Sequence, residues 1–142
     1  MATLGTFVSG QVLTAAELNA IGTWTSYTPT YTGLTIVNGT VVARWMECNK
    51  MVSFYWRYTV GSSDSVPGPH TISLPVAPAY YGHIFNAYIR VPGLQTIVVA
   101  AENFADLTDN NVRLRSANSG AVGNATISSG NIVVIEGTYE KA

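Results

Sequence analysis

The residue types that carry most enzymatic chemistry are sparse in this sequence. It contains a single cysteine, Cys48, and two histidines, His70 and His83. A cysteine nucleophile needs a histidine within hydrogen-bond reach, so the fold would have to bring one of these histidines to Cys48. The local motifs that surround known nucleophilic cysteines are absent. We therefore predict that the chain is not an enzyme and that Cys48 packs as a small apolar residue.

A second candidate is the acidic segment at residues 106–111, which looks like the start of a calcium-binding loop. Loops of the EF-hand type need glycine at the sixth position and glutamate at the twelfth, where this chain has Asn111 and Ala117. An Asx turn ahead of a strand explains the segment better, and a cation bound near Asp106 and Asp109 is the alternative. The sequence has no phosphate-binding loop, nucleophile elbow or zinc-protease motif. It therefore predicts no cofactor and no metal.

Aromatic side chains supply the other available chemistry, because their rings can stack on the apolar face of a sugar while their polar tips stay hydrated. The candidates for such a platform are Trp24, Tyr27, Tyr31, Tyr80, Tyr81 and Tyr88. Tyr80 and Tyr81 follow a proline-bounded strand, and we expect them at a loop tip, in contact with a glycan or a partner protein. The alternative, which we favour for most of these aromatics, is a place in the core or between subunits.

The low charge of the chain limits the classes of partner. Only 11% of the residues are charged, compared with roughly 25% in soluble domains, so uncharged polar residues and glycine must form the surface. Such a surface suits an ordinary β-rich domain or, as we favour, a protein packed in an assembly. A net charge of −1 predicts no nucleic-acid binding. No apolar run approaches the ~20 residues of a membrane span, and no signal peptide is recognisable.

Short strands are predicted along most of the chain after Trp24. Residues 51–60 alternate most clearly, with one apolar face formed by Val52, Phe54, Trp56, Tyr58 and Val60. Further inward positions are predicted at Ile72, Leu74, Phe85, Ala87, Ile89, Val91, Val112, Leu114, Val133, Ile135 and Tyr139. Asn38-Gly39 separates two apolar runs, residues 34–37 and 40–43, and predicts a β-hairpin with a type I′ turn. About eight such strands without a long helix predict an all-β fold, either a two-sheet antiparallel β-sandwich or a small barrel.

The first 22 residues differ from the rest, and we predict that they form an N-terminal attachment arm ahead of a sandwich domain at residues 23–142. Thr14 and Glu17 form a capping box, and a helix of about two turns should end near Gly22. A helix this short does not persist alone in water, so it must dock on its own domain or on another subunit. The apolar residues that would make this attachment are Phe7, Val8, Val12, Leu13, Leu18 and Ile21.

Several motifs follow one another in a specific order. They are residues 7–19 (FVSGQVLTAAELN), 24–33 (WTSYTPTYTG), 38–45 (NGTVVARW), 49–52 (NKMV), 73–75 (SLP) and 136–140 (EGTYE). In these motifs the chain resembles the small β-sandwich modules of bacteriophage minor structural, tail-associated and decoration proteins. Tyr31 stands where the related modules more often have tryptophan, and Cys48-Asn49 replaces a more usual small residue and glycine. Residues 79–131 carry little of the resemblance.

The resemblance implies a jelly-roll-like sandwich that is displayed on the exterior of a virion and forms a homotrimer. It implies a non-catalytic structural role as a capsid decoration protein, a head fibre or a tail-accessory module, bound to other capsid or tail proteins through the N-terminal arm. It implies no enzymatic residues. The alternative is a tip module that binds a host receptor or a surface glycan.

Overall fold

The fold is built from antiparallel β-strands and the loops that connect them. A computed structural model describes residues 9–10, 12, 14–16, 21–66, 70–93, 96–102, 110–115 and 127–142. These ranges contain the strands β1 (Thr25–Ser26), β2 (Tyr31–Thr32), β3 (Thr40–Cys48), β4 (Met51–Thr59), β5 (Thr71–Ser73), β6 (Ile84–Arg90), β7 (Thr96–Glu102), β8 (Asn111–Arg115) and β9 (Ile132–Glu140). Within the same ranges no helix has the length and apolar character needed to cross a bilayer.

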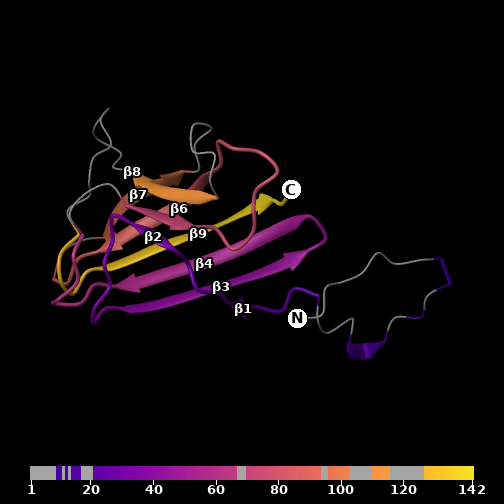
Figure 1. Cartoon of the computed structure of the whole chain (residues 1–142), viewed down its shortest axis with the longest axis horizontal. Coiled ribbons are helices and arrows are strands. Elements are labelled where there is room, and N and C mark those ends of the chain that lie inside the picture. The colour runs from indigo at the N-terminus through magenta and orange to yellow at the C-terminus, as the bar shows by residue number, and fades with distance from the viewer. Residues whose placement is uncertain are drawn as a thin grey trace.

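The strands are hydrogen-bonded into one continuous sheet, which folds back on itself so that two layers face each other. Neighbours follow the order β1-β3-β4-β9-β6-β7-β8-β5-β2, and every pair is antiparallel. Figure 1 shows the sheet curling over itself along this order. As a result, the ring of Tyr31 in β2, at one end of the order, lies 6.5 Å from the ring of Trp56 in the middle of β4. The predicted all-β, sandwich-like architecture is therefore confirmed, and the short strands β1 and β2 are additions to the predicted set.

The core lies between the two layers and is rich in aromatic rings. All five residues predicted to line it from positions 52–60 are buried. Phe54 packs edge-on against Phe85 of β6, with ring centroids 5.0 Å apart, and the ring of Tyr139 in β9 contacts both. The other predicted inward residues are buried wherever their side chains are described, except Val91, which is half-buried. Each large side chain buried in this way contributes roughly 1.5–3 kcal/mol.

The predicted hairpin at Asn38-Gly39 is wrong. Residues 34–37 form no strand, because Thr35 instead exchanges two backbone hydrogen bonds of 2.9 Å with Ser65. A type I′ turn requires positive φ at both central residues, and neither Asn38 nor Gly39 has it. The segment before β3 therefore pairs with the loop that follows β4.

The β3–β4 hairpin turns at a different dipeptide. Cys48 pairs with Met51, so the turn consists of Asn49 and Lys50. Asn49 has a φ of 55°, in the left-handed region that asparagine tolerates better than most residues. Asparagine at this position thus meets a backbone requirement that glycine would also meet.

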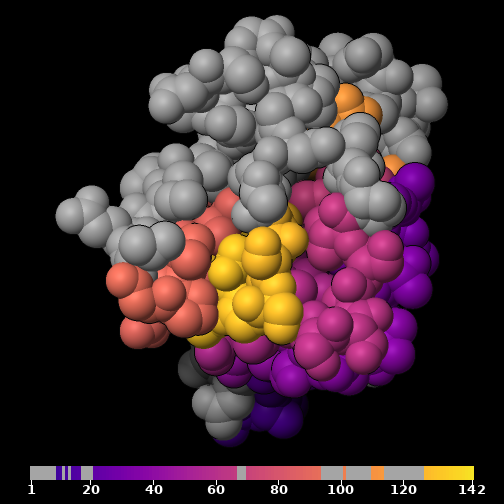
Figure 2. Space-filling view, turned by 90° about the vertical axis from the view of Figure 1, so that its left-hand side faces the viewer, coloured from indigo at the N-terminus to yellow at the C-terminus, as the bar shows by residue number. Residues whose placement is uncertain are grey.

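The opposite end of the sandwich is closed by loops. Val60 exchanges backbone hydrogen bonds of 2.9 Å with Gly130 and Asn131, which joins the end of β4 to the start of β9. Figure 2 looks onto this end, where the yellow segment that leads into β9 lies between the magenta segment that follows β4 and the coral segment that follows β6. The segment after β4 and the segment before β9 are therefore bound to each other.

Candidate functional site

The predicted attachment arm is described only in part. Four of its predicted contact residues lie outside the described residues, as does most of the predicted helix: Phe7, Val8, Leu13 and Leu18. Val12 is 85% exposed and Ile21 is 38% exposed. Among the described residues, the first side chain that packs against the core is Tyr27. The described part of the arm, which extends beyond the sheets in Figure 1, therefore exposes apolar surface and adds nothing to the core.

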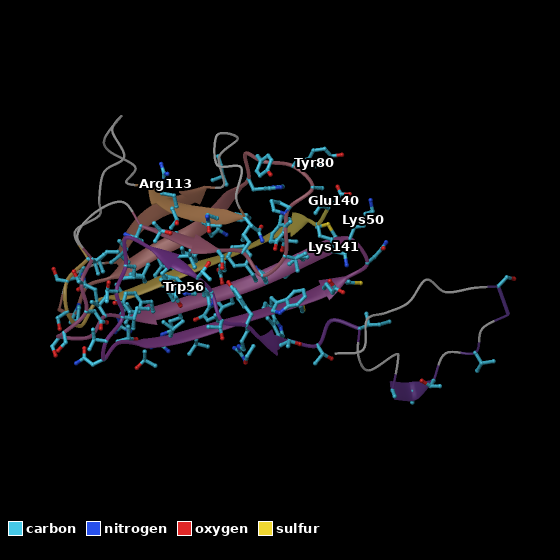
Figure 3. All side chains as sticks on the ribbon, viewed as in Figure 1. Lys50, Trp56, Tyr80, Arg113, Glu140 and Lys141 are labelled. Atoms are coloured by element: carbon cyan, nitrogen blue, oxygen red, sulfur yellow. The ribbon has the colours of Figure 1, made fainter. Side chains whose placement is uncertain are left out.

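Tyr80 and Tyr81, the predicted glycan or partner contacts, lie in the connection between β5 and β6. Their side chains are 67% and 46% exposed, as expected for a loop tip. The connection is held to the last strand, because the Ala79 N–H donates to the Glu140 carbonyl oxygen at 2.8 Å. Figure 3 shows Tyr80 at the same end of the molecule as Lys50 and Glu140. The two tyrosines thus project from a loop that is fixed at its base.

This end of the molecule, which we call the hairpin end (residues 47–51, 78–84 and 140–142), carries both lysines of the chain. Lys141 Nζ lies 3.0 Å from a carboxylate oxygen of Glu47, with the two side chains 27% and 22% exposed. Lys50 Nζ is 3.8 Å from Glu140, and both side chains are more exposed. Large apolar side chains are exposed at the same end: Met51, Tyr80, Tyr81 and Ile84. The hairpin end thus combines paired charges with uncovered apolar surface.

Cys48 does not pack in the core, which corrects the sequence prediction. Its side chain is exposed, and Cys48 is the last residue of β3, next to the turn of the hairpin. His70 is 5% exposed, and the His83 ring stacks on Phe85 with centroids 5.9 Å apart. No hydrogen bond joins the Cys48 thiol to either histidine among the described residues.

The Asp64 carboxylate accepts five hydrogen bonds and ties two loops together. One oxygen accepts three consecutive backbone N–H groups at 2.7, 2.9 and 3.1 Å, those of Val37, Asn38 and Gly39. The other oxygen accepts the Tyr58 hydroxyl and the Gly61 N–H, each at 2.7 Å. We call this region the Asp64 end (residues 37–40 and 58–65). Sequence reasoning missed it, although an aspartate in a loop rich in glycine and serine is a recognised signal of side-chain-to-backbone bonding.

The lowered pKa of Asp64 and the space left by two glycines both explain this arrangement. Burial opposes ionisation of the Asp64 carboxyl, but the Tyr58 hydroxyl and the backbone N–H groups hold its pKa well below the usual 3.8. Two glycines make room for the carboxylate and its donors. A Cβ on Gly39 would lie 2.7 Å from the Tyr58 ring, and a Cβ on Gly61 would lie 2.5 Å from the Gly39 nitrogen. The carboxylate is therefore ionised and held by directed hydrogen bonds from two loops, which suits a structural clamp.

A shallow cavity of about 270 Å³ lies on the outward face of β4, β9 and β6. Its lining residues are Trp24, Ser53, Phe54, Asn86, Glu136, Gly137 and Thr138. Asn86 and Glu136 are direct cross-strand neighbours, and Ser53 Oγ lies 3.0 Å from Thr138 Oγ1. Trp24, which precedes β1, is 44% exposed. Of these residues, only Trp24 was predicted from the sequence as a possible binding residue, and Phe54 was predicted as a core residue.

The remaining candidate from the sequence is a cation bound near Asp106 and Asp109. Asp106 and Asp109 lie outside the described residues. The described residues contain no group of three or more histidine, cysteine, aspartate or glutamate side chains that could hold a metal ion.

No protein-family model, no curated protein and no solved structure matches the chain, so its function is proposed from its own residues.

Proposed function

We propose that this chain is a non-catalytic structural module of a bacteriophage particle, displayed on the outer surface as a capsid decoration protein, head fibre or tail-accessory module. Residues 1–22 anchor it to another capsid or tail protein, and residues 23–142 form a jelly-roll-like sandwich. Two features support this proposal. The motifs quoted above occur in the order found in such modules, and the fold is all-β and sandwich-like, as the resemblance implies.

The observation that carries the proposal is the separation between the arm and the core. Val12 and Ile21 are exposed, whereas the packing of the described core begins only at Tyr27. Apolar side chains that precede a packed core without joining it gain stability when another molecule covers them. A partner that binds the arm can therefore bury these side chains without rearranging the sandwich.

Three charged side chains of the sandwich, those of Asp64, Glu47 and Lys141, support a structural role. The Asp64 carboxylate binds two loops together through its five hydrogen bonds. Glu47 and Lys141 link β3 to the end of the chain. These side chains are engaged in holding the fold, so they are not available as a general acid or base.

The proposed assembly state is a homotrimer. The low charged fraction of 11% leaves a surface with little electrostatic repulsion between copies. Light scattering of the purified chain should give three times the 15.1 kDa mass of one copy. A monomer at working concentration contradicts the trimer but leaves the attachment arm intact as a proposal.

The anchor is tested by charge substitution in the arm. Val12→Asp should reduce incorporation into particles at least about tenfold, because docking would bury an unpaired carboxylate. Ser9→Asp is the matched control, since it adds the same charge at another exposed arm position. Mass spectrometry of purified particles measures incorporation, and circular dichroism checks that both variants keep the sandwich. Undiminished incorporation of Val12→Asp and of a chain that begins at residue 23 contradicts the proposal.

A second candidate function is a tip module that binds a host receptor or surface glycan through the β5–β6 loop. The exposure of Tyr80 and Tyr81 favours it, because such side chains commonly anchor contacts. A glycan array probed with the purified protein discriminates the two functions. A specific signal that is lost in both Tyr80→Ala and Tyr81→Ala promotes this second function over the structural one.

A further inference from the structure

We propose that the cavity beside Trp24 binds a carbohydrate. It takes one ring of a neutral saccharide, with Trp24 as the stacking surface and the facing polar side chains of β4, β9 and β6 as its hydrogen-bond partners. This inference does not depend on the chain being a virion protein. It also concerns a different part of the surface from the Tyr80 loop.

The first support is the placement of Trp24. Thr25 of the edge strand β1 pairs with Trp45 of β3, and Trp24 directly precedes Thr25. Met46, the next residue of β3, pairs with Ser53, which lines the cavity. The indole is 44% exposed and forms part of the cavity wall. A tryptophan ring in this position offers an apolar face to the C–H groups of a sugar ring.

The second support is the pair of polar side chains on β6 and β9. Asn86 and Glu136 lie directly opposite each other, and both line the cavity. Neither side chain has a hydrogen-bond or ion-pair partner in the described part of the chain. An amide can donate and accept, and a carboxylate accepts only. Together they match two neighbouring sugar hydroxyls, each of which donates and accepts.

The third support comes from the hydroxyl groups on the next row of the sheet. Ser53 Oγ and Thr138 Oγ1 are 3.0 Å apart across β4 and β9, so one donates to the other. A hydroxyl has one donor and two acceptor sites, which leaves acceptor capacity toward the cavity after this bond. The four polar side chains thus surround one position from two adjacent rows.

The charge and the volume of the cavity limit the class of ligand that it can bind. Glu136 is the only ionisable group among the lining residues, so a carboxylated or sulfated sugar would meet like charge there. The volume of about 270 Å³ lies just below the roughly 300–1,000 Å³ of typical small-molecule sites. A cavity of this size and shallowness fits a single ring, and we expect dissociation constants in the millimolar range, about 1 mM.

The test is an NMR titration of the full-length protein with four neutral sugars: methyl glucoside, methyl galactoside, methyl mannoside and N-acetylglucosamine. At least one should shift the Trp24 indole N–H and Asn86 side-chain resonances. Trp24→Ala should weaken that binding at least tenfold, and Trp24→Phe should weaken it less because a smaller ring still stacks. Tyr80→Ala is the matched control for loss of an exposed aromatic and should leave the affinity unchanged.

A second experiment tests the role of charge in the cavity. Glucuronate should bind severalfold more weakly than glucose to the natural chain, and Glu136→Gln should reduce that difference. Unchanged resonances outside the cavity show that each variant is folded. The proposal is overturned if no neutral sugar shifts the cavity resonances, or if Trp24→Ala binds as well as the natural chain. It is also overturned if Tyr80→Ala abolishes the binding, or if arginine methyl ester binds the cavity more tightly than every sugar.

Discussion

The two ends of the β3–β4 hairpin hold their charged side chains in opposite ways. At the Asp64 end, one carboxylate accepts five hydrogen bonds of 2.7–3.1 Å from two loops and a buried tyrosine. At the hairpin end, Lys50 and Glu140 are 3.8 Å apart, with side chains 68% and 41% exposed. The first arrangement fixes a charge by directed bonds, whereas the Lys50–Glu140 pair leaves its charges in water and the Lys141–Glu47 pair is partly shielded.

Because of this difference, the Asp64 end contributes to the stability of the fold, whereas the hairpin end is available for contact with a partner. Hydrogen bonds to an ionised group are strong, and their loss leaves donors unpaired. Exposed ion pairs contribute little, because water screens them and their side chains lose entropy on pairing. We infer that the Asp64 end maintains the fold, while the hairpin end, with its uncovered apolar side chains, can be altered or covered by a partner at little cost to stability.

The largest effect should follow removal of the Asp64 carboxylate. Asp64→Ala leaves four backbone N–H groups and the Tyr58 hydroxyl without their acceptor, so we expect a larger loss of unfolding free energy than for any substitution at the hairpin end. Urea denaturation measures this loss. Ser62→Ala is the matched control in the same loop, because it removes a single exposed hydrogen bond. Equal midpoints for the two variants would remove the basis of the comparison.

Low pH should lower the stability of the fold by protonating the Asp64 carboxylate. The pKa of Asp64 is depressed in the folded state relative to 3.8, so its contribution to stability is complete above about pH 4 and is lost as the pH falls below that value through the folded pKa. The natural chain should therefore lose stability more steeply than Asp64→Asn below about pH 4, because the amide does not titrate. Thermal unfolding over this range measures the effect, and parallel curves contradict it.

The next effect concerns the space that the clamp requires. Gly61→Ala should lower the unfolding free energy by about 3 kcal/mol, since the added carbon would meet the backbone of Gly39, which cannot move aside cheaply. Ser63→Ala in the same loop should change it by less than about 0.5 kcal/mol. Chemical denaturation of both variants checks this contrast. A Gly61→Ala variant as stable as Ser63→Ala would mean that the two loops are not in close contact.

The smallest effects are expected at the hairpin end. Lys141→Ala should cost about 1 kcal/mol or less, because its pair with Glu47 is only partly shielded from water. Lys50→Ala, which removes the longer and more exposed pair, should cost a few tenths, about 0.3 kcal/mol. Denaturation in low and high salt measures both. A loss at Lys141 comparable to that at Gly61 would show that the two ends do not differ as described.

The sandwich itself could be predicted because burial on one side leaves a period-two pattern in the sequence. Val52, Phe54 and Trp56 alternate with polar residues, and all three are buried. The Asn38-Gly39 hairpin failed for a physical reason. The backbone N–H groups there bond to Asp64, which is about 25 residues away, and no local pattern reveals such a long-range bond.

The candidate sites were less predictable than the fold. Exposure of Tyr80 and Tyr81 could be expected from a proline-bounded loop, whereas the cavity beside Trp24 depends on cross-strand register. Asn86 and Glu136 are fifty residues apart and become neighbours only because β6 pairs with β9. Their positions between inward-facing residues mark them as outward-facing, but the sequence does not say which strands are adjacent.

The central claim is that the sandwich is displayed outside a particle and is held there by its N-terminal arm. An electron cryomicroscopy map of the intact particle tests this claim most directly. The account predicts sandwich-sized density on the exterior, in groups of three, with the chain before Trp24 buried against a capsid or tail protein. Absence of the chain from the particle, or a map in which the hairpin end makes the attachment while residues 1–22 lie in solvent, would contradict it.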